Sequence, residues 1–337
     1  QVDTDEFDRG VVMHEWGHFF EDELSRSDSI GGRHVIPGTV EPRVAFSEGW
    51  GYGIGAIATN DPVSCDTGVP DSSGGGLDLE DNSGYGQLGF FNEMSVAMIL
   101  YDLYDTNADG VDTRSIGFAP IYDTMTMASA QKGTEAFTTI FSFATELRSM
   151  LSDSADQAFL DALLDRENID TGTLDIWGDG QTRQPGGADF LPVYADLPLD
   201  GSPLDICTNS DYDPDGDGTK PGEWRYLRFT TAGAGRWRAI ATANPAPPPT
   251  QTTGEDRSDP DMWLYREGDL MNICPGATCQ DTGSGVSVQA DTETMDTTTL
   301  NADTYTLAFN DWRFGDDERA SDYPSETCFT ITMNPLR

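Results

Sequence analysis

Apolar residues recur at intervals of three and four along the first half of the chain, whereas apolar and polar residues alternate in short runs along the second half. The first spacing places apolar side chains on one face of an α-helix, and the second places them on one face of a β-strand. The patterns predict helices over residues 8–24, 43–58, 90–105, 136–151 and 156–168. They predict strands over residues 224–232, 235–243, 261–267, 286–291, 303–311 and 328–333.

The change of pattern divides the 337-residue chain into two predicted domains. Residues 1–195 form a mainly helical domain in which loops rich in glycine and aspartate separate the helices. Residues 196–337 contain short strands joined by turn-rich stretches, an arrangement typical of an antiparallel β-sandwich. The stretch 194–205 is the predicted linker. We therefore expect an α+β protein, with a helical domain followed by a sandwich.

The chain is strongly acidic, with 59 Asp and Glu against 19 Lys and Arg and a net charge of −40. Such a surface repels nucleic acid and anionic membranes, so we expect no nucleic acid and no membrane as partners. It also offers many oxygen ligands for calcium. No apolar run reaches the length of a transmembrane helix. This balance is typical of a salt-tolerant secreted protein.

Five cysteines agree with an extracellular location. Cys274 and Cys279 enclose a short loop, and Cys207 and Cys328 lie near the two ends of the predicted sandwich, so we expect two disulfides and an oxidising compartment. Cys65 is left over, either as a free thiol or as the partner of a cysteine outside this chain. We expect the chain to be a mature or trimmed product whose export signal was removed.

The segment HEWGH, residues 14–18, places two histidines four residues apart on a predicted helix. Residues i and i+4 share a helix face, so His14 and His18 can bind one zinc ion. Glu15 lies beside them and can accept a proton from an attacking water. The same short pattern also occurs by chance on ordinary helices, so a third ligand is needed to decide between the two interpretations.

Two glutamates are candidates for the third ligand. Glu48 follows His18 by 30 residues and begins an apolar helix, where a carboxylate is costly unless it is paired or binds a metal. Glu93 follows His18 by 75 residues and would require a long inserted loop. A metzincin-type histidine six residues after His18 is excluded, because that residue is Leu24. We therefore predict zinc at His14, His18 and Glu48, with Glu93 as the alternative.

The pair HEWGH and SEGWG resembles the motifs of the gluzincin metallopeptidases, and the segment EGW is similar to the third-ligand segment of fungalysin-type members. The resemblance covers roughly residues 8–60. It implies a zincin-type catalytic domain in which His14, His18 and Glu48 hold zinc. It also implies that Glu15 is the general base for the hydrolysis of peptide bonds.

Two features separate this chain from those relatives. They often carry an aspartate four residues after the ligand glutamate, whereas this chain has Tyr52. They also place a β-sheet before the zinc-binding helix, and only about seven residues precede that helix here. We therefore expect that the sheet was removed or that it stays bound as a separate piece, a cleaved N-terminal segment of the same precursor. The segment around Glu93 resembles the thermolysin-type third-ligand pattern, which keeps the alternative open.

The gluzincin mechanism also requires a hydrogen-bond donor to the oxyanion that forms during hydrolysis, commonly a tyrosine or a histidine. His34 is the third histidine of the chain, and it stands between the predicted ligands in sequence. A loop histidine with no role is an equally good interpretation of it. The candidates for the donor are therefore His34, Tyr52, Tyr85 and Tyr122.

Two aspartate-rich loops match the first half of a calcium loop, D-x-[DN]-x-[DN]-G. Position twelve is Ile116 in one loop and Gly222 in the other, so neither is a complete EF-hand. Solvated turns are the alternative interpretation. The predicted calcium ligands are Asp105, Asn107, Asp109 and Asp112 in the first loop and Asp211, Asp213, Asp215 and Asp217 in the second.

The strand-rich half resembles, in strand pattern and context, the pre-peptidase C-terminal β-sandwich of secreted bacterial proteases. The resemblance implies an accessory module. We therefore expect a secreted zinc endopeptidase that acts on a protein or peptide substrate. The alternatives are a zinc hydrolase of another substrate class and a non-catalytic binding protein that retains the zincin scaffold.

Overall fold

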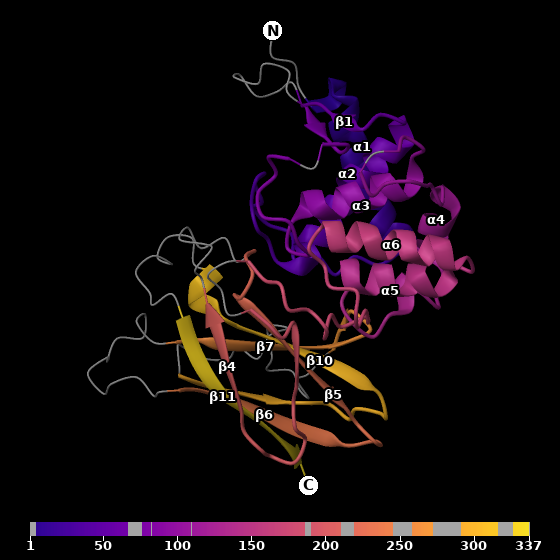
Figure 1. Cartoon of the computed structure of the whole chain (residues 1–337). Helices are drawn as coiled ribbons and strands as arrows, with labels where there is room; N and C mark the ends of the chain where they lie inside the picture. The colour runs from indigo at the N-terminus through magenta and orange to yellow at the C-terminus, as the bar shows by residue number, and fades with distance from the viewer. Residues whose placement is uncertain are drawn as a thin grey trace. The chain divides into compact units, whose positions relative to one another are not determined.

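The computed structural model describes residues 5–66, 76–81, 83–108, 110–185, 190–209, 219–244, 258–271, 291–315 and 326–336. The chain forms two compact units, Gln1–Pro185 and Gly186–Arg337, so the division lies after residue 185 rather than after residue 195. The first unit is mainly helical and the second consists of β-strands, as the α+β prediction requires (Figure 1). Each unit is described by itself below.

The first unit contains all five predicted helices and one that the pattern did not reveal. The additional helix, Phe118–Thr126, is short and follows Gly117, whose φ is +71°. None of the described helices is both long and apolar enough to cross a membrane. The elements of this unit are η1 Asp5–Phe7, α1 Arg9–Leu24, α2 Pro42–Thr59, β1 Val63–Ser64, β2 Leu77–Asp78, α3 Glu93–Tyr104, α4 Phe118–Thr126, η2 Gln131–Gly133, α5 Ile140–Met150 and α6 Ser154–Arg166.

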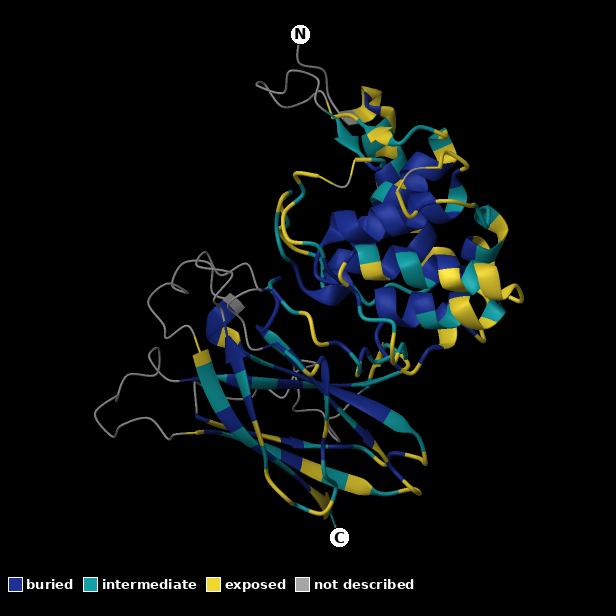
Figure 2. Cartoon of the chain, in the orientation of Figure 1, coloured by how far each residue is buried: buried dark blue, intermediate teal, exposed yellow. Residues whose placement is uncertain are grey.

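Helix α2 lies at the centre of the first unit, because it packs against both α1 and α3 and almost all of its residues are buried (Figure 2). Its start is fixed by Glu41, whose carboxylate accepts hydrogen bonds from the backbone N–H groups of Arg43 and Val44. Its end is fixed by Asn60, which adopts the left-handed conformation. The helix that carries Glu48 is therefore rigidly placed.

Glycines let α1 and α2 approach each other closely. A Cβ atom on Gly17 of α1 would lie 2.6 Å from the side chain of Ile54 and 3.0 Å from the Cα of Gly51. A Cβ atom on Gly51 of α2 would lie 2.8 Å from the ring of His14. Larger residues at these positions would force the two helices apart. The close crossing is what brings the predicted zinc ligands of the two helices together.

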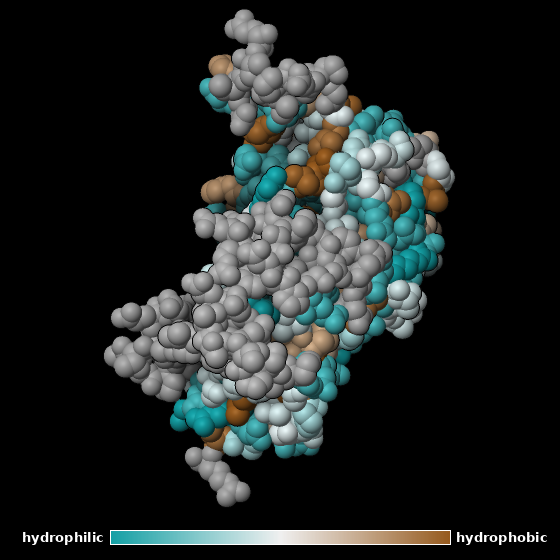
Figure 3. All heavy atoms as spheres, turned by 90° about the vertical axis from the view of Figure 1, so that its left-hand side faces the viewer, coloured by the Kyte–Doolittle hydropathy of each residue, from teal (hydrophilic) through white to brown (hydrophobic). Residues whose placement is uncertain are grey.

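The surface of the described residues is largely hydrophilic, as the strongly acidic composition predicts (Figure 3). Figure 3 shows hydrophilic residues over much of the described surface, interrupted by apolar patches. On α1, the side chains of Val12, Trp16 and Phe19 are 47%, 43% and 60% exposed. These three residues lie on the opposite side of the helix from the buried His14, so α1 presents two faces of different character.

The second unit is a β-sandwich, because two sheets enclose one hydrophobic core. One sheet has the strand order β3-β5-β10-β7-β8 and the other has the order β4-β11-β6-β9. Leu227, Leu307 and Phe309 of the first sheet and Phe329 and Ile331 of the second belong to the core. The strands are β3 Tyr194–Asp196, β4 Leu204–Asn209, β5 Trp224–Thr230, β6 Arg236–Ala243, β7 Pro260–Arg266, β8 Asp269–Leu270, β9 Thr292–Asp296, β10 Thr304–Asp311 and β11 Glu326–Leu336, with η4 Trp312–Gly315.

Two details differ from the predicted arrangement. The stretch 194–205 was expected as a linker, yet it contains β3, which pairs in parallel with β5, and the first residues of β4. Strand β9 begins at Thr292, just after the predicted strand 286–291, most of which lies outside the described residues. Short strands flanked by prolines carry too few alternating positions to be recognised by pattern alone.

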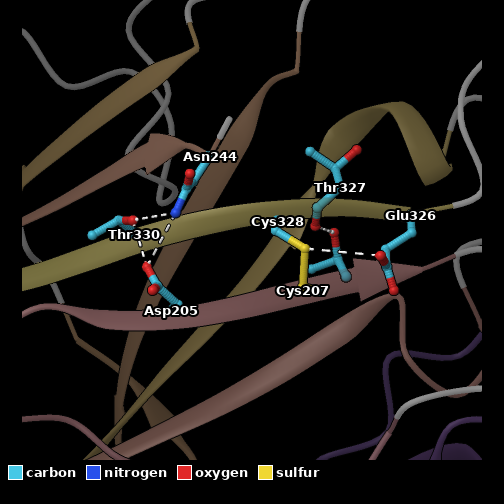
Figure 4. The surroundings of a disulfide bond; sticks show 8 residues. Asp205, Cys207, Asn244, Glu326, Thr327, Cys328 and Thr330 are labelled. Atoms are coloured by element: carbon cyan, nitrogen blue, oxygen red, sulfur yellow. Dashed lines mark hydrogen bonds between the residues drawn. A yellow bond between two sulfur atoms is a disulfide. The ribbon is translucent and has the colours of Figure 1, made fainter. Parts of the chain in front are cut away.

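The predicted disulfide between Cys207 and Cys328 is present, with an S–S distance of 1.99 Å. Figure 4 shows that it joins β4 to β11, and the two cysteines are directly opposite each other in the strand register. Cys65 is a free, exposed thiol. The predicted pair Cys274 and Cys279 lies outside the described residues.

Candidate metal centre

Three side chains of the first unit meet at one point. His14 and His18 extend from α1, and their Nε2 atoms lie 3.0 Å apart. Oε2 of Glu48, on α2, lies 3.2 Å from Nε2 of His14 and 3.4 Å from Nε2 of His18. His14 and Glu48 are buried, and His18 is partly buried. The structure therefore brings together the three residues that the sequence analysis proposed as ligands.

The spacing of these three atoms fits a tetrahedral zinc ion. Zinc binds imidazole nitrogen and carboxylate oxygen at about 2.0–2.1 Å, so neighbouring ligand atoms in a tetrahedron lie about 3.3 Å apart. The three measured separations, 3.0, 3.2 and 3.4 Å, are close to that edge length. Two imidazoles and one carboxylate are also a ligand set typical of catalytic zinc, which keeps its fourth position open.

The electrostatics of Glu48 suit a cation. Burial alone would raise the pKa of its carboxyl, but hydrogen bonds to His14 and His18 and the charges of His34 and His18 hold that pKa well below its ordinary value. Glu48 therefore stays ionised in a buried position. Burial alone would lower the pKa of His18, yet its contact with Glu48 and the charges of Glu48, Glu21 and Glu15 raise it. The centre is thus rich in negative charge.

His18 has partners on the side away from the centre. The hydroxyl Oγ of Ser47 lies 3.3 Å from Nδ1 of His18, and the same hydroxyl donates a hydrogen bond of 2.6 Å to Oε2 of Glu21. Glu21 is 1% exposed. The sequence analysis did not identify this connection, because Ser47 and Glu21 belong to different helices and carry no motif.

His14 differs from His18 in its surroundings. Its Nδ1 atom is buried and has no hydrogen-bond partner in the part of the chain that the structure describes. The ring of Tyr52 packs against that of His14, with 4.3 Å between the ring centroids. Tyr52 occupies the position where the gluzincin resemblance implies an aspartate, so the expected carboxylate partner is replaced by an aromatic ring.

His34 also faces the centre. Its Nε2 atom lies 3.3 Å from Oε2 of Glu48, and its Nδ1 atom lies 2.9 Å from Oε2 of Glu93. Glu93 is 2% exposed and begins α3, directly after the N-cap residue Asn92. Its carboxylate is therefore the acceptor that fixes the ring of His34 with Nε2 toward Glu48. Glu93 contacts His34 rather than the pair of zinc-site histidines.

The tyrosines named as candidate donors are placed differently from one another. Tyr52 lies at the centre, and burial together with the charges of Glu93 and Glu48 raises the pKa of its hydroxyl far above the ordinary value. The hydroxyl of Tyr85 accepts from the backbone N–H of Asp78 and donates to the carbonyl of that residue. Tyr122 packs on Phe20 and is 40% exposed. Of the three tyrosines, Tyr52 packs against His14, one of the candidate ligands.

Glu15, the predicted base, lies on the exposed side of α1 next to the centre. Its charge raises the pKa of both His18 and Tyr52. A cavity of about 140 Å³ lies beside Tyr52 and is lined by residues at the start of α1, in α2 and around β1, among them Gly10, Gly55 and Ser64. The cavity reaches Tyr52, but His14, His18 and Glu48 do not line it.

A second acidic group lies at the end of α3. Carboxylate oxygens of Glu80, Asp102 and Asp105 lie within 4.8 Å of one another. The pKa of Asp102 is raised to about 8, by burial above all and by the charges of Asp112 and Asp105, although its contact with Arg166 opposes the rise. Of the predicted calcium ligands, Asp105 belongs to this group, whereas Asp109, Asp211, Asp213, Asp215 and Asp217 lie outside the described residues. The sequence analysis did not identify Glu80 or Asp102.

Other residues of the first loop lie near this group. The side chain of Asn107 donates to Glu80 at 3.4 Å, and its backbone N–H donates to Asp105 at 2.6 Å. Asp112 is 1% exposed. Asp105 and Asp112 are thus buried, whereas the described residues between them are exposed.

Comparisons with known proteins give limited matches. No family model matches the chain. An uncharacterized protein of Archaeoglobus fulgidus is 34% identical over 104 residues, which cover 29% of this chain and 28% of that protein, so the match spans little more than a quarter of that relative. The crystal structure of the pre-peptidase C-terminal domain of a Bacillus anthracis collagenase is similar to 42% of this chain over 91% of its own length, with 8% identity and a TM-score of 0.24. Neither likeness supports a conclusion about function.

Proposed function

We propose that the protein is a secreted zinc-dependent endopeptidase. The observation that carries the proposal is the meeting of His14, His18 and Glu48 at the separations of a tetrahedral zinc site. Glu15 directly follows the first histidine, the position of the general base in the HExxH pattern. The β-sandwich unit would serve as the accessory module, and the disulfide fits an oxidising compartment.

Each residue around the centre has a separate proposed role in the hydrolysis of a peptide bond. Zinc at His14, His18 and Glu48 would activate a water molecule and polarise the carbonyl of the substrate. Glu15 would accept the proton of the attacking water and deliver it to the departing amine. His34, held by Glu93 with Nε2 toward the centre, has the geometry of a donor to the developing oxyanion. Tyr52 remains the second candidate for that donor.

The substrate class follows from the acidity of the chain. A net charge of −40 disfavours nucleic acids and other polyanions near the centre. Proteins or peptides, and above all those with basic segments, would approach this surface readily. A zinc hydrolase with another substrate is the second candidate, because the ligand set determines the metal and not the bond that is broken.

The proposal predicts that the purified protein hydrolyses casein or gelatin, that a zinc chelator abolishes the hydrolysis, and that added zinc restores it. Zinc-dependent hydrolysis of small esters or amides without any digestion of protein would favour the second candidate. A stably folded protein that holds zinc but hydrolyses neither class would instead be a binding protein, and the proposal would be wrong.

We also propose calcium at loop 105–112, supported by the carboxylates of Glu80, Asp102 and Asp105 gathered at the end of α3. Calcium at a hundredfold excess over its Kd is expected to raise the melting temperature of the first unit by roughly 5 to 10 °C. Sodium chloride of equal ionic strength should raise it less, because it only screens the acidic surface. Differential scanning calorimetry on the wild type and on Asp105→Asn checks this: a calcium-specific rise that survives in Asp105→Asn would place the ion elsewhere.

A further inference from the structure

We infer that Glu21 is a positioning residue for the metal ligand His18, acting through the hydroxyl of Ser47. The inference rests on the proposed zinc site and adds to it a buried carboxylate three residues beyond the HEWGH segment. It identifies the group that holds His18 in the orientation and tautomer that zinc requires.

The three side chains form a hydrogen-bonded row with one consistent direction. A zinc ion on Nε2 of His18 leaves the proton of that imidazole on Nδ1. Nδ1 lies 3.3 Å from Oγ of Ser47, so it can donate to the hydroxyl. The hydroxyl then donates its own proton to Oε2 of Glu21 at 2.6 Å. Each donor thus meets an acceptor, and the row ends on a carboxylate.

Glu21 is a buried carboxylate on the inward face of α1. His14, Gly17, Phe20 and Glu21 are the buried residues of α1, so Glu21 lies on the same inward face as the candidate ligand His14. The carboxyl is 1% exposed, and its pKa is raised to about 7, by burial above all and by the charge of Asp28, although hydrogen bonds from Ser47 and Ser27 and the charge of His18 oppose the rise. The folded protein therefore bears a desolvation cost that an apolar residue would avoid.

The row also provides a carboxylate that can orient a ligand histidine in place of the aspartate that the gluzincin resemblance implies at position 52. In metal sites, a ligand histidine usually donates its second N–H to a carboxylate or carbonyl, and the partner orients the ring and raises its basicity. Tyr52 stands where the resemblance implies that carboxylate, and Nδ1 of His14 has no partner in the described part of the chain. In this chain the supporting carboxylate is Glu21 of α1, which acts on His18 instead of His14, through Ser47 of α2.

The test measures zinc affinity by competition with a chelator. Glu21→Gln keeps the shape and the hydrogen-bond acceptor but removes the charge, and Ser47→Ala breaks the row at its centre. Each is expected to weaken zinc binding about 10- to 100-fold. The double variant should lose no more than the stronger single variant, because both act through the same row. The absorption spectrum of the cobalt-substituted protein should shift in both variants, which reports the ligand field of His18 directly.

A matched control separates this role from general destabilisation. Glu167, also fully buried and paired with Arg166 in α6, lies outside the centre. Glu167→Gln should lower the melting temperature without changing zinc affinity or the cobalt spectrum. If the wild type binds zinc and Glu21→Gln binds it equally well, the inference is overturned while the proposed site stands. If the wild type binds no zinc, the proposed site and the inference both fail.

Discussion

Glu15→Gln is expected to lower the rate of protein hydrolysis by a factor on the order of 10² or more while leaving the zinc content and the fold unchanged. Glutamine has nearly the shape of glutamate but cannot accept a proton. Glu15 is not among the three atoms that meet at the candidate centre, and its exposed position on α1 means that the substitution removes no buried contact. The effect should therefore appear in kcat and not in metal binding.

The measurement compares turnover of a casein substrate with zinc content determined by elemental analysis on the same samples. Glu23→Gln is the matched control, because Glu23 is exposed on the same helix and removal of its charge changes the acidity of α1 equally. Glu23→Gln should keep wild-type turnover. Full activity in Glu15→Gln would assign the general base to another residue.

The second large effect concerns the ligands themselves. His18→Ala and Glu48→Gln should each lose zinc, because a ligand atom is removed or neutralised. The loss of zinc affinity should exceed the factor of about 10 to 100 that is typical when a residue supporting a ligand is removed. Glu93→Gln should keep one zinc ion per chain but lose turnover, because its carboxylate contacts His34 instead of the pair His14 and His18. Zinc stoichiometry after extensive dialysis, together with casein turnover, checks the three variants.

This comparison also decides between the two candidates for the third ligand. Loss of zinc in Glu93→Gln combined with retention in Glu48→Gln would reverse the assignment. Circular dichroism on each variant controls for unfolding, since Glu48 and Glu93 are both buried in helices that contact each other. A His34→Gln variant that retains zinc but loses turnover would further support the role of His34 as donor.

The helices and the ligand pair were predictable because their signals are local. His14 and His18 are four residues apart on one helix, and the apolar run that surrounds Glu48 marks a buried carboxylate within a single segment. Strands β6 and β10 of the sandwich likewise show alternation of apolar and polar residues within eight residues. Local periodicity was sufficient for these elements.

The remaining parts of the site depend on how distant segments pack. Glu93 meets His34 across 59 residues of sequence, and Ser47 meets Glu21 across 26. No spacing rule connects these pairs, because their contact is created by the packing of α2 between its neighbours and by the close approach at Gly17 and Gly51. Glu80 and Asp102 joined the acidic group for the same reason. Partners of this kind are visible only once the helices are placed.

The strand order of the sandwich has a consequence for the time at which each unit can form. Strand β11, the last in sequence, lies between β4 and β6, and β10 lies between β5 and β7, so the centre of each sheet is supplied by residues 304–336. Helices α1, α2 and α3, by contrast, contact their neighbours in sequence. A chain that emerges from its N-terminus can therefore assemble the helical core early. In the sandwich, the pairs β3–β5, β7–β8 and β6–β9 can form first, but β10 is needed to join two of them into one sheet, and β4 has no strand partner before β11. The helical unit would then form before the sandwich, and the slow step of folding would lie in the sandwich.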